Sequence, residues 1–215
     1  MTVVERLAGL IDGLPGDRVL VAFDGPDAAG KTTLAREVAG SLARPAICAS
    51  VDGWHHPREV RLSRGAESPE GYYLDSFNLD ALVDDLLTPF RRGASYVPTS
   101  RFDHRADTAV RADQHVAERA ALLFDGVFLL RQELATQWDL RVYVHVPEEI
   151  TLSRALVRDL DLFGSEAALR QRYERRYLPG QALYRDRAAP REAADVVLDN
   201  SDWRDPVILR WPAGS

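Results

Sequence analysis

The chain of 215 residues is 46% hydrophobic and 28% charged, a balance typical of a folded globular protein and not of a disordered one. Its 27 Lys and Arg residues against 33 Asp and Glu residues give a net charge of −6, which repels nucleic-acid backbones and anionic bilayers. We therefore expect no nucleic-acid partner and no membrane partner. The one cysteine, Cys48, excludes an internal disulfide, and no apolar run reaches the roughly 18 residues of a membrane span. Since the first residues also lack the pattern of a signal peptide, we expect a cytoplasmic protein.

Short apolar runs alternate with helical patterns along the chain. The apolar runs predict buried strands at residues 18–24, 45–52, 120–125, 140–146 and 196–198. Apolar residues at helical spacing predict helices at residues 4–14, 31–43, 79–90, 148–159 and 167–177. Elements in this alternation form a mainly parallel sheet with helices on both faces. We predict a three-layer α/β fold in a single domain over residues 1–215, because no repeat or linker divides the chain.

A phosphate-binding motif lies between the first predicted strand and the helix that follows it. Residues 25–32 read GPDAAGKT and satisfy the pattern G-x-x-x-x-G-K-[ST] of a P-loop. Backbone N–H groups of such small residues can curl around phosphate oxygens, and the helix N-terminus adds a favourable dipole. Lys31 is expected to reach the β- and γ-phosphates of ATP or GTP. The residues expected to contact the nucleotide are Gly25, Asp27, Ala28, Ala29, Gly30, Lys31, Thr32 and Thr33.

Magnesium accompanies the nucleotide in such loops, held by the loop hydroxyl and by an acid on a neighbouring strand. Thr32 supplies the hydroxyl, and Asp125, which ends the apolar run 120–125, fits the acid. The alternative for a strand-terminal aspartate, and for Asp24 before the loop, is a structural role in a turn. The predicted cofactors are ATP or GTP with Mg²⁺, and the predicted metal ligands are Thr32 and Asp125.

A kinase also needs a group that accepts the proton of the acceptor hydroxyl, and cations that cover the transferring phosphoryl group. Asp52 ends the second apolar run, which we expect beside the phosphate loop in a parallel sheet, and is the candidate base. Arg154 and Arg158 share one face of a predicted helix and are the candidate cations of a lid at about residues 154–176. The alternatives are a turn-capping aspartate and a solvated helix face. The predicted catalytic residues are Asp52, Lys31, Arg154 and Arg158.

Further motifs resemble the uridine kinase-like family of P-loop kinases, whose superfamily also holds phosphoribulokinase and bacterial pantothenate kinase. They follow the phosphate loop in the family's order within about residues 18–200. These motifs are Asp52-Gly53-Trp54-His55, Gly71-Tyr72-Tyr73-Leu74-Asp75, Asp125-Gly126-Val127-Phe128, residues 154–159 and residues 194–200. The resemblance implies transfer of the γ-phosphate of ATP to a hydroxyl of a small molecule, in the first place a nucleoside such as uridine or cytidine.

The resemblance also implies an acceptor pocket within about residues 53–105 and makes Asp52 the base toward the acceptor. Asp75 would hold the ribose hydroxyls, Tyr73 would line the pocket, and residues 102–105 would recognise the nucleobase. Arg172 falls near a position that holds the nucleoside. The residues expected to contact the acceptor are Tyr73, Asp75, Arg101, Asp103, His104, Arg105 and Arg172.

Two motifs depart from the uridine kinase pattern and leave the acceptor open. The chain has Asp52-Gly53-Trp54-His55 where uridine kinases usually have Asp-Asp-Phe-Tyr, and Asp125-Gly126 in place of Glu-Gly. A pantothenate or sugar kinase of the same superfamily is the alternative within this class. The alternative outside it is a regulatory protein that hydrolyses nucleotide without an acceptor. Homo-oligomer formation and the packing of the tail, residues 203–215, also stay open.

Overall fold

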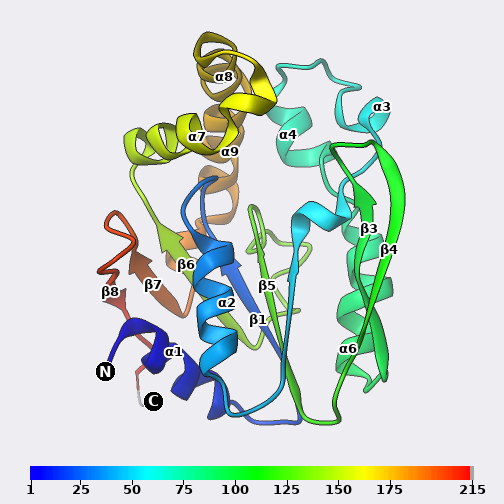
Figure 1. Cartoon of the computed structure of the whole chain (residues 1–215), viewed down its shortest axis with the longest axis vertical. Helices are drawn as coiled ribbons and strands as arrows, with labels where there is room; N and C mark the ends of the chain where they lie inside the picture. Colours follow the sequence, from blue (N-terminus) through cyan, green and yellow to red (C-terminus); the bar gives the residue numbers. More distant parts are fainter. Residues whose placement is uncertain (214–215) are drawn as a thin grey trace.

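The computed structural model describes residues 1–213, and its centre is a 6-stranded sheet (Figure 1). All neighbouring strands are parallel except the last pair, which runs antiparallel at one edge. In spatial order the strands are β2 (Ala46–Ser50), β5 (Ala120–Gly126), β1 (Arg18–Asp24), β6 (Leu140–His145), β7 (Val196–Asp199) and β8 (Val207–Arg210). The predicted strands are all present. The sequence does not predict β8, whose side chains are mostly exposed at the sheet edge.

The inner strands are apolar on both faces because helices cover both faces. Every residue of β5 is buried, as is every residue of β1 after Arg18. A parallel sheet that is covered on both sides needs such continuous apolar runs. The two cores on either side of the sheet confirm the expected three-layer α/β fold.

One face of the sheet is covered by α1 (Val3–Asp12) and α2 (Lys31–Ser41). Leu7 of α1 and Val38 of α2 are fully buried in the same core as Val21 of β1. Because α2 begins where the phosphate loop ends, this packing also fixes the loop against the sheet.

The other face is covered by a helical stretch over residues 79–91 and, near the chain's end, by α9 (Leu178–Ala188) with the short α10 (Pro190–Ala193). The stretch is made of α5 (Leu79–Leu82), a π-helical turn (Val83–Leu87) and α6 (Thr88–Arg91), where the sequence predicts one helix. Its fully buried side chains are Leu82, Leu86, Leu87 and Phe90.

Between β2 and β5 the chain leaves the sheet and builds the side of the molecule that carries the predicted acceptor pocket (Figure 1). A 3₁₀ turn (Val51–Trp54) leads to α3 (Arg58–Arg61) and α4 (Pro69–Asp75). A hairpin of β3 (Tyr96–Asp103) and β4 (Thr108–His115) then forms a separate 2-stranded sheet. The sequence does not predict this hairpin, because β4 is exposed along its whole length and carries no apolar run.

The predicted lid segment lies at the top of Figure 1, beyond the carboxyl ends of the central strands. It consists of α7 (Glu148–Phe163), α8 (Glu166–Arg172) and a π-helical turn (Tyr173–Tyr177). The π-helical turn continues into α9 with helical backbone angles, so one helical stretch leads from the lid to the sheet. Tyr173 packs with Ala155 in a small core of the lid itself.

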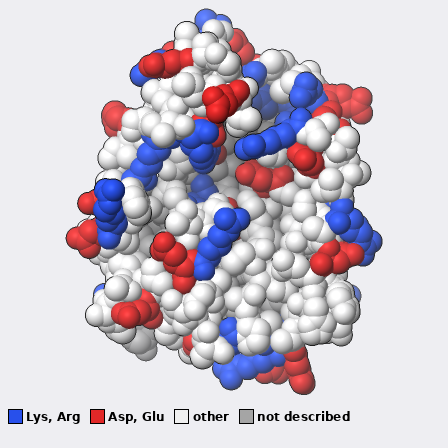
Figure 2. Space-filling view, in the orientation of Figure 1, with Lys and Arg blue, Asp and Glu red and all other residues white. Residues whose placement is uncertain are grey.

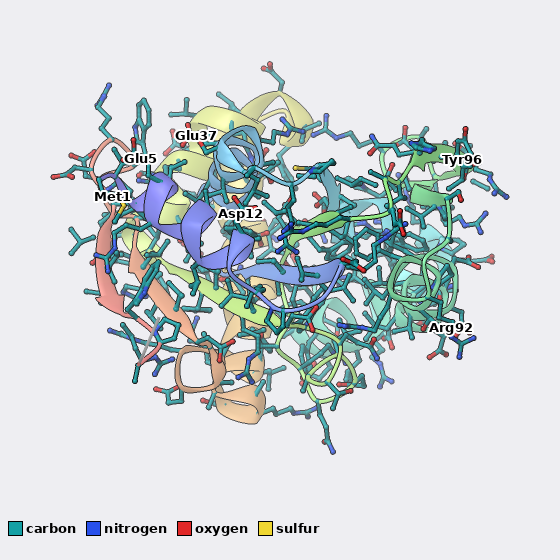
Figure 3. All side chains as sticks on the ribbon, turned by 90° about the horizontal axis from the view of Figure 1, so that it is seen from below. Met1, Glu5, Asp12, Glu37, Arg92 and Tyr96 are labelled. Atoms are coloured by element: carbon teal, nitrogen blue, oxygen red, sulfur yellow. The ribbon has the colours of Figure 1, made fainter. Side chains whose placement is uncertain are left out.

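The first residues of the chain and strand β8 lie at the same side of the molecule (Figure 1). The guanidinium of Arg6 lies 4.6 Å from the ring centroid of Trp211, and β8 pairs with β7, so the tail packs on its own chain. Figure 3 shows Met1 and Glu5 at the side opposite Tyr96 of β3. Among residues 1–213, no helix is long and apolar enough to cross a bilayer.

Candidate nucleotide and acceptor site

Acidic residues meet at one edge of the sheet, where the parallel strands end. Asp24 ends β1 in register with Gly126, and Ser50 ends β2 in register with Asp125. The expectation that the strand before Asp52 lies beside the strand of the phosphate loop is wrong, because β5 lies between β2 and β1. The strand next to β2 is instead the one that carries Asp125.

A close approach at Gly126 brings the turn of Asp52 near Asp125. A Cβ atom at position 126 would lie 2.5 Å from Cγ1 of Val51, so the turn after β2 can pack against the end of β5 only because residue 126 is glycine. A Cβ atom at Gly53 would likewise lie 2.9 Å from a side-chain oxygen of β3. Asp52 is exposed between these two contacts, so its carboxylate is open to solvent at the strand ends.

The phosphate loop has the conformation that its small residues permit. Ala28 and Gly30 have positive φ angles of 55° and 87°. The side-chain amide of Asn200 donates a 2.7 Å hydrogen bond to the carbonyl of Ala29 and would lie 2.7 Å from a Cβ atom at Gly30. Both the φ angle and this contact favour glycine at position 30. With α2 beginning at Lys31, the loop presents backbone N–H groups and a helix N-terminus, an arrangement that binds phosphate.

The Lys31 ammonium lies inside the loop. Its Nζ donates a 2.6 Å hydrogen bond to the carbonyl of Pro26, and the residue is 8% exposed. Burial raises the pKa of Asp24 to about 6 and also raises the pKa of Asp27, while the charge of Lys31 opposes both shifts. A cation at this position can neutralise the phosphate groups of a nucleotide that the loop binds.

Thr32, Ser50 and Asp125 form a group that fits a magnesium ion. Oγ1 of Thr32 donates a 2.7 Å hydrogen bond to Oδ2 of Asp125, and Oγ of Ser50 donates to the same oxygen at 3.2 Å. Burial raises the pKa of Asp125 and the charge of Asp52 raises it further, whereas the Thr32 hydrogen bond lowers it. Residues 1–213 hold no group of three or more His, Cys, Asp and Glu side chains that could by itself bind a metal ion. One carboxylate with hydroxyl groups suits Mg²⁺, which takes its other ligands from phosphates and water.

The candidate lid arginines have different partners. Arg154 donates two 2.9 Å hydrogen bonds to backbone carbonyls of the segment after β7. Arg158 pairs with Asp159 through hydrogen bonds of 2.8 Å and 2.7 Å. Its charge also counters the burial that raises the pKa of Asp27, so Arg158 lies near the phosphate loop.

Asp27 takes part in a hydrogen-bond network that the sequence does not reveal. Its Oδ2 accepts a 2.8 Å hydrogen bond from the hydroxyl of Tyr72 on α4 and a 2.9 Å hydrogen bond from the amide of Gln181 on α9. Asp24 accepts a hydrogen bond from the hydroxyl of Tyr184, which is also on α9. These donors lie far along the chain from the loop, so no local motif points to them.

Several of the predicted acceptor residues already have partners within the chain. Tyr73 is 5% exposed and lies in the core. Asp75 forms a 2.7 Å salt bridge with Arg64, and Arg101 forms a 3.0 Å salt bridge with Asp85. The side chains of Asp75 and Arg101 are thus engaged with neighbours of opposite charge.

The segment after β3 divides between two locations. Asp103 accepts hydrogen bonds of 2.9 Å and 3.1 Å from the N–H groups of Arg105 and the residue after it, and so caps the exposed hairpin turn. The His104 ring instead stacks on His55, with ring centroids 4.5 Å apart. Nδ1 of His55 is 3.0 Å from the carbonyl oxygen of Asp52. Of this segment, His104 is therefore the residue that lies against the turn of the candidate base.

Arg172 reaches the acceptor side of the molecule from the lid. It donates a hydrogen bond to the carbonyl of Ala66. The adjacent Glu67 accepts from Gln171 at 2.7 Å and from Arg175 at 2.9 Å. The lid helices therefore dock on the loop between α3 and α4. Figure 2 shows a hollow in the surface with Lys or Arg and Asp or Glu atoms around it.

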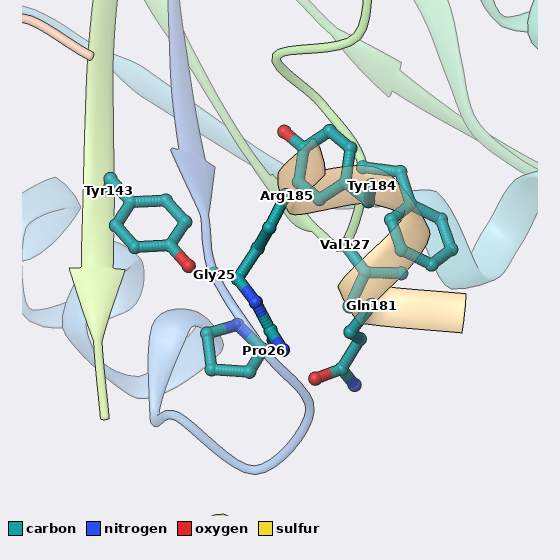
Figure 4. Close-up of a pocket in the computed structure, with 8 residues that line it drawn as sticks. Gly25, Pro26, Val127, Tyr143, Gln181, Tyr184 and Arg185 are labelled. Carbon is teal, nitrogen blue, oxygen red and sulfur yellow. The ribbon is translucent and has the colours of Figure 1, made fainter. Parts of the chain in front are cut away.

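Two empty spaces of very different size flank the phosphate loop. An open groove of about 1110 Å³ runs past α1, α2 and the segment after β7, and its lining includes Thr33, Arg154 and Trp203. A cavity of about 10 Å³ lies on the other side of the loop, lined by Gly25 and Gln181 among others (Figure 4). Of these two spaces, the groove has room for the base and sugar of a nucleotide.

The sheet order, the loop after β1 and the acids at the strand ends define a P-loop kinase fold. The sequence model of the Phosphoribulokinase / Uridine kinase family matches residues 20–177, and the chain belongs to this family. The resemblance drawn from the motifs is thereby confirmed. Membership of a family of kinases supports a nucleotide-binding phosphotransferase that acts on a small molecule.

Solved structures share this fold at low sequence identity. A possible uridine kinase from Bacillus stearothermophilus aligns with a TM-score of 0.73 and 22% identity, covering 90% of this chain and 96% of that chain. A candidate fructose transport system kinase from Silicibacter sp. aligns with a TM-score of 0.69 and 24% identity, covering 90% and 96%. The D-glycerate 3-kinase from Cryptococcus neoformans aligns with a TM-score of 0.61 and 10% identity, covering 93% and 95%. No curated protein matches the chain in sequence.

Proposed function

We propose that the protein is an ATP-dependent kinase that transfers the γ-phosphate to a hydroxyl group of a small molecule, with a nucleoside of the uridine or cytidine type as the first candidate. One observation carries the proposal. The phosphate loop and a solvent-open carboxylate, that of Asp52, lie together at the strand ends beside the Thr32–Asp125 pair. A protein that only hydrolyses nucleotide needs no such acid for an acceptor.

In this proposal the loop holds the triphosphate. Backbone N–H groups of residues 27–32 and the N-terminus of α2 bind phosphate oxygens, and Lys31 neutralises the β- and γ-phosphates. Mg²⁺, when held by Thr32 and Asp125, supplies further charge neutralisation. Arg158 lies near the loop and stabilises the negative charge of the transferring group as the lid closes.

Asp52 accepts the proton of the acceptor hydroxyl at a carboxylate oxygen. Within residues 1–213 this carboxylate forms no hydrogen bond and no ion pair, so both of its oxygens can face the acceptor. Since phosphoryl transfer depends mainly on positioning and electrostatics, the same oxygens orient the hydroxyl toward the γ-phosphate.

The groove past α1 and α2 receives the base and ribose of ATP or GTP. Trp203 lines this groove with 59% of its surface exposed, and its ring offers a face for stacking. Arg154 lies in the same lining, where its bonds to the segment after β7 fix one wall. In this proposal Arg154 contributes to nucleotide binding as well as to the lid.

A sugar or a small hydroxy acid such as pantothenate is the second candidate for the acceptor. Asp103 and Arg105 lie at the hairpin turn, and the His104 ring stacks on His55 beside the turn of Asp52. A nucleobase would therefore have fewer contacts than the resemblance implies. The fold is also shared with a candidate fructose transport system kinase and with a D-glycerate 3-kinase.

Release of ADP from Mg-ATP, measured with one acceptor at a time, tests the proposal. The panel holds uridine, cytidine, pantothenate, ribulose 5-phosphate, fructose and D-glycerate. We expect one acceptor class to stimulate ADP release by about tenfold or more. Slow release that no acceptor changes would favour the hydrolysing, regulatory alternative.

A further inference from the structure

We propose that Asp27 is a positioning residue that ties the phosphate loop to the acceptor-side helix α4 and to the lid helix α9. The proposal extends the proposed function and rests on it for the kinetic part of its test only. Asp27 stands inside the loop whose N–H groups bind phosphate, where a carboxylate adds unfavourable negative charge. Such a residue needs another reason for its presence, and its hydrogen bonds supply one.

The first link is the hydroxyl of Tyr72, which donates to Oδ2 of Asp27 at 2.8 Å. Tyr72 is 6% exposed, and its ring packs on Phe128 and on Tyr177 with centroids 4.9 Å away in both cases. A Cβ atom at Gly180 would lie 2.7 Å from Cδ1 of Tyr72, so α9 approaches the ring as closely as glycine allows. Because Phe128, Tyr177 and α9 pack on the ring from several sides, the position of its hydroxyl is fixed.

The second link is the amide of Gln181, which donates to the same Oδ2 at 2.9 Å. Gln181 is 4% exposed, and its own Oε1 is buried without a partner among the described residues. One turn further along α9, Tyr184 donates to Asp24. Figure 4 shows Gln181 and Tyr184 extending from α9 beside Gly25 and Pro26. The helix α9 thus donates hydrogen bonds to Asp24 and to Asp27, the carboxylates before and after the first turn of the phosphate loop.

These links join the phosphate loop to α4 and to the helical stretch that begins in the lid. The helical stretch of α9 begins in the lid, where α8 docks on the loop that precedes α4. A shift of the lid or of α4 therefore acts on Asp27, and through its backbone on the N–H groups that orient phosphate. The loop reaches its transfer geometry only when α4 and α9 are in place.

Four single variants test this link. Tyr72→Phe removes one donor, Asp27→Ala removes the acceptor, and Asp27→Asn keeps an oxygen that can accept both hydrogen bonds. Tyr143→Phe is the matched control, because Tyr143 lines the small cavity beside Gly25 and its hydroxyl forms no hydrogen bond within residues 1–213.

We expect Tyr72→Phe and Asp27→Ala to lower kcat about tenfold, with KM for Mg-ATP changed by less than about threefold, since these bonds orient the loop without touching the nucleotide. Asp27→Asn should stay within about threefold of the wild type, and Tyr143→Phe should match it. Equal kcat values for Tyr72→Phe and Tyr143→Phe would overturn the proposal, and so would an Asp27→Asn defect as large as that of Asp27→Ala.

Hydrogen exchange of the protein without ligand gives a readout that needs no acceptor. The backbone amides of residues 27–32 should exchange faster in Tyr72→Phe and Asp27→Ala than in the wild type, Asp27→Asn and Tyr143→Phe. Unchanged exchange in both Tyr72→Phe and Asp27→Ala would overturn the link. A wild type that transfers no phosphate but shows this pattern of exchange would refute the proposed function and leave the link standing.

Discussion

At the scale of single residues, Asp52 differs from the other acids of the site. Asp27 and Asp125 are each held by hydrogen bonds from neighbouring side chains, whereas the Asp52 carboxylate is open to solvent. An acid that is to receive a proton from a substrate needs this accessibility. Asp75 is a poorer candidate for the base by the same reasoning, because its carboxylate is paired with Arg64.

Asp52→Asn should lower acceptor-dependent turnover by about 10²- to 10⁴-fold, because the amide has nearly the same shape but cannot accept the proton. The Kd for Mg-ATP should stay within about threefold of the wild type, since Asp52 lies outside the phosphate loop. Steady-state kinetics and calorimetry measure the two quantities. The control is Asp113→Asn on the exposed strand β4, which should change neither. Near-normal turnover of Asp52→Asn would exclude a role as base.

Asp24→Asn should change how the free energy of unfolding depends on pH. Burial raises the pKa of Asp24 to about 6, so between about pH 4 and 6 the folded protein binds more protons at this residue than the unfolded chain does. The stability that Asp24 contributes is therefore present below pH 4 and is lost as the pH rises through about 6. From pH 4 to pH 7 the variant should gain about 2 kcal/mol relative to the wild type, as urea unfolding at both pH values would measure. If the free energies of unfolding of the variant and the wild type differ by the same amount at both pH values, the raised pKa of Asp24 is contradicted.

Single residues of the site are predictable where a contiguous motif specifies them. Lys31 and Thr32 belong to the pattern of the phosphate loop, and Asp125 ends an apolar run that indicates an inner strand. Ser50 and Tyr72 carry no such signal, because strand pairing and helix packing bring them to the site. Tertiary contacts between distant segments are what the sequence alone does not display.

At the scale of elements, the contact between α4 and α9 depends on a glycine. Gly180→Ala would place a Cβ atom 2.7 Å from Cδ1 of Tyr72 and 3.1 Å from the carbonyl oxygen of Pro69. We expect a loss of about 1–3 kcal/mol in the free energy of unfolding, because one of the two helices has to shift. Thermal or urea unfolding measures the loss.

The matched control is Gly9→Ala in α1, where a Cβ atom would meet nothing within 4 Å. Here alanine should stabilise by about 0.5–1 kcal/mol, because glycine in a helix loses more conformational freedom on folding. Similar effects of the two substitutions would contradict the close packing of α4 on α9.

Helices and inner strands follow from apolar periodicity, but elements at the surface do not. The predicted helix at residues 79–90 appears as a continuous helical stretch with a π-helical turn, since its apolar face is what fixes it to the sheet. The β3–β4 hairpin has an exposed second strand and an irregular register, so no alternation of polar and apolar residues marks it. The acceptor side is built from such elements, and for this reason its residues were the hardest to place from the sequence.

At the scale of the whole molecule, general rules predict the fold and the position of the phosphate loop from the sequence, but they do not predict the identity of the acceptor. Alternating strands and helices imply a parallel sheet, and its strand ends bring loops from distant segments to one edge. The family match over residues 20–177 agrees with this architecture. The identity of the acceptor depends instead on the surface that α4, the hairpin and the lid form together. Asp103 and His104 show that adjacent residues can lie in different parts of that surface.

The central claim is transfer of a phosphoryl group to an acceptor, and product analysis tests it most directly. The wild type is incubated with Mg-ATP and the acceptor that most stimulates ADP release, and phosphorus NMR follows the products. The account predicts one new phosphomonoester for each ADP formed, with little inorganic phosphate, and loss of this product in Asp52→Asn. Inorganic phosphate formed in equal amount to ADP, with or without acceptor, would contradict the account and identify a nucleotide hydrolase.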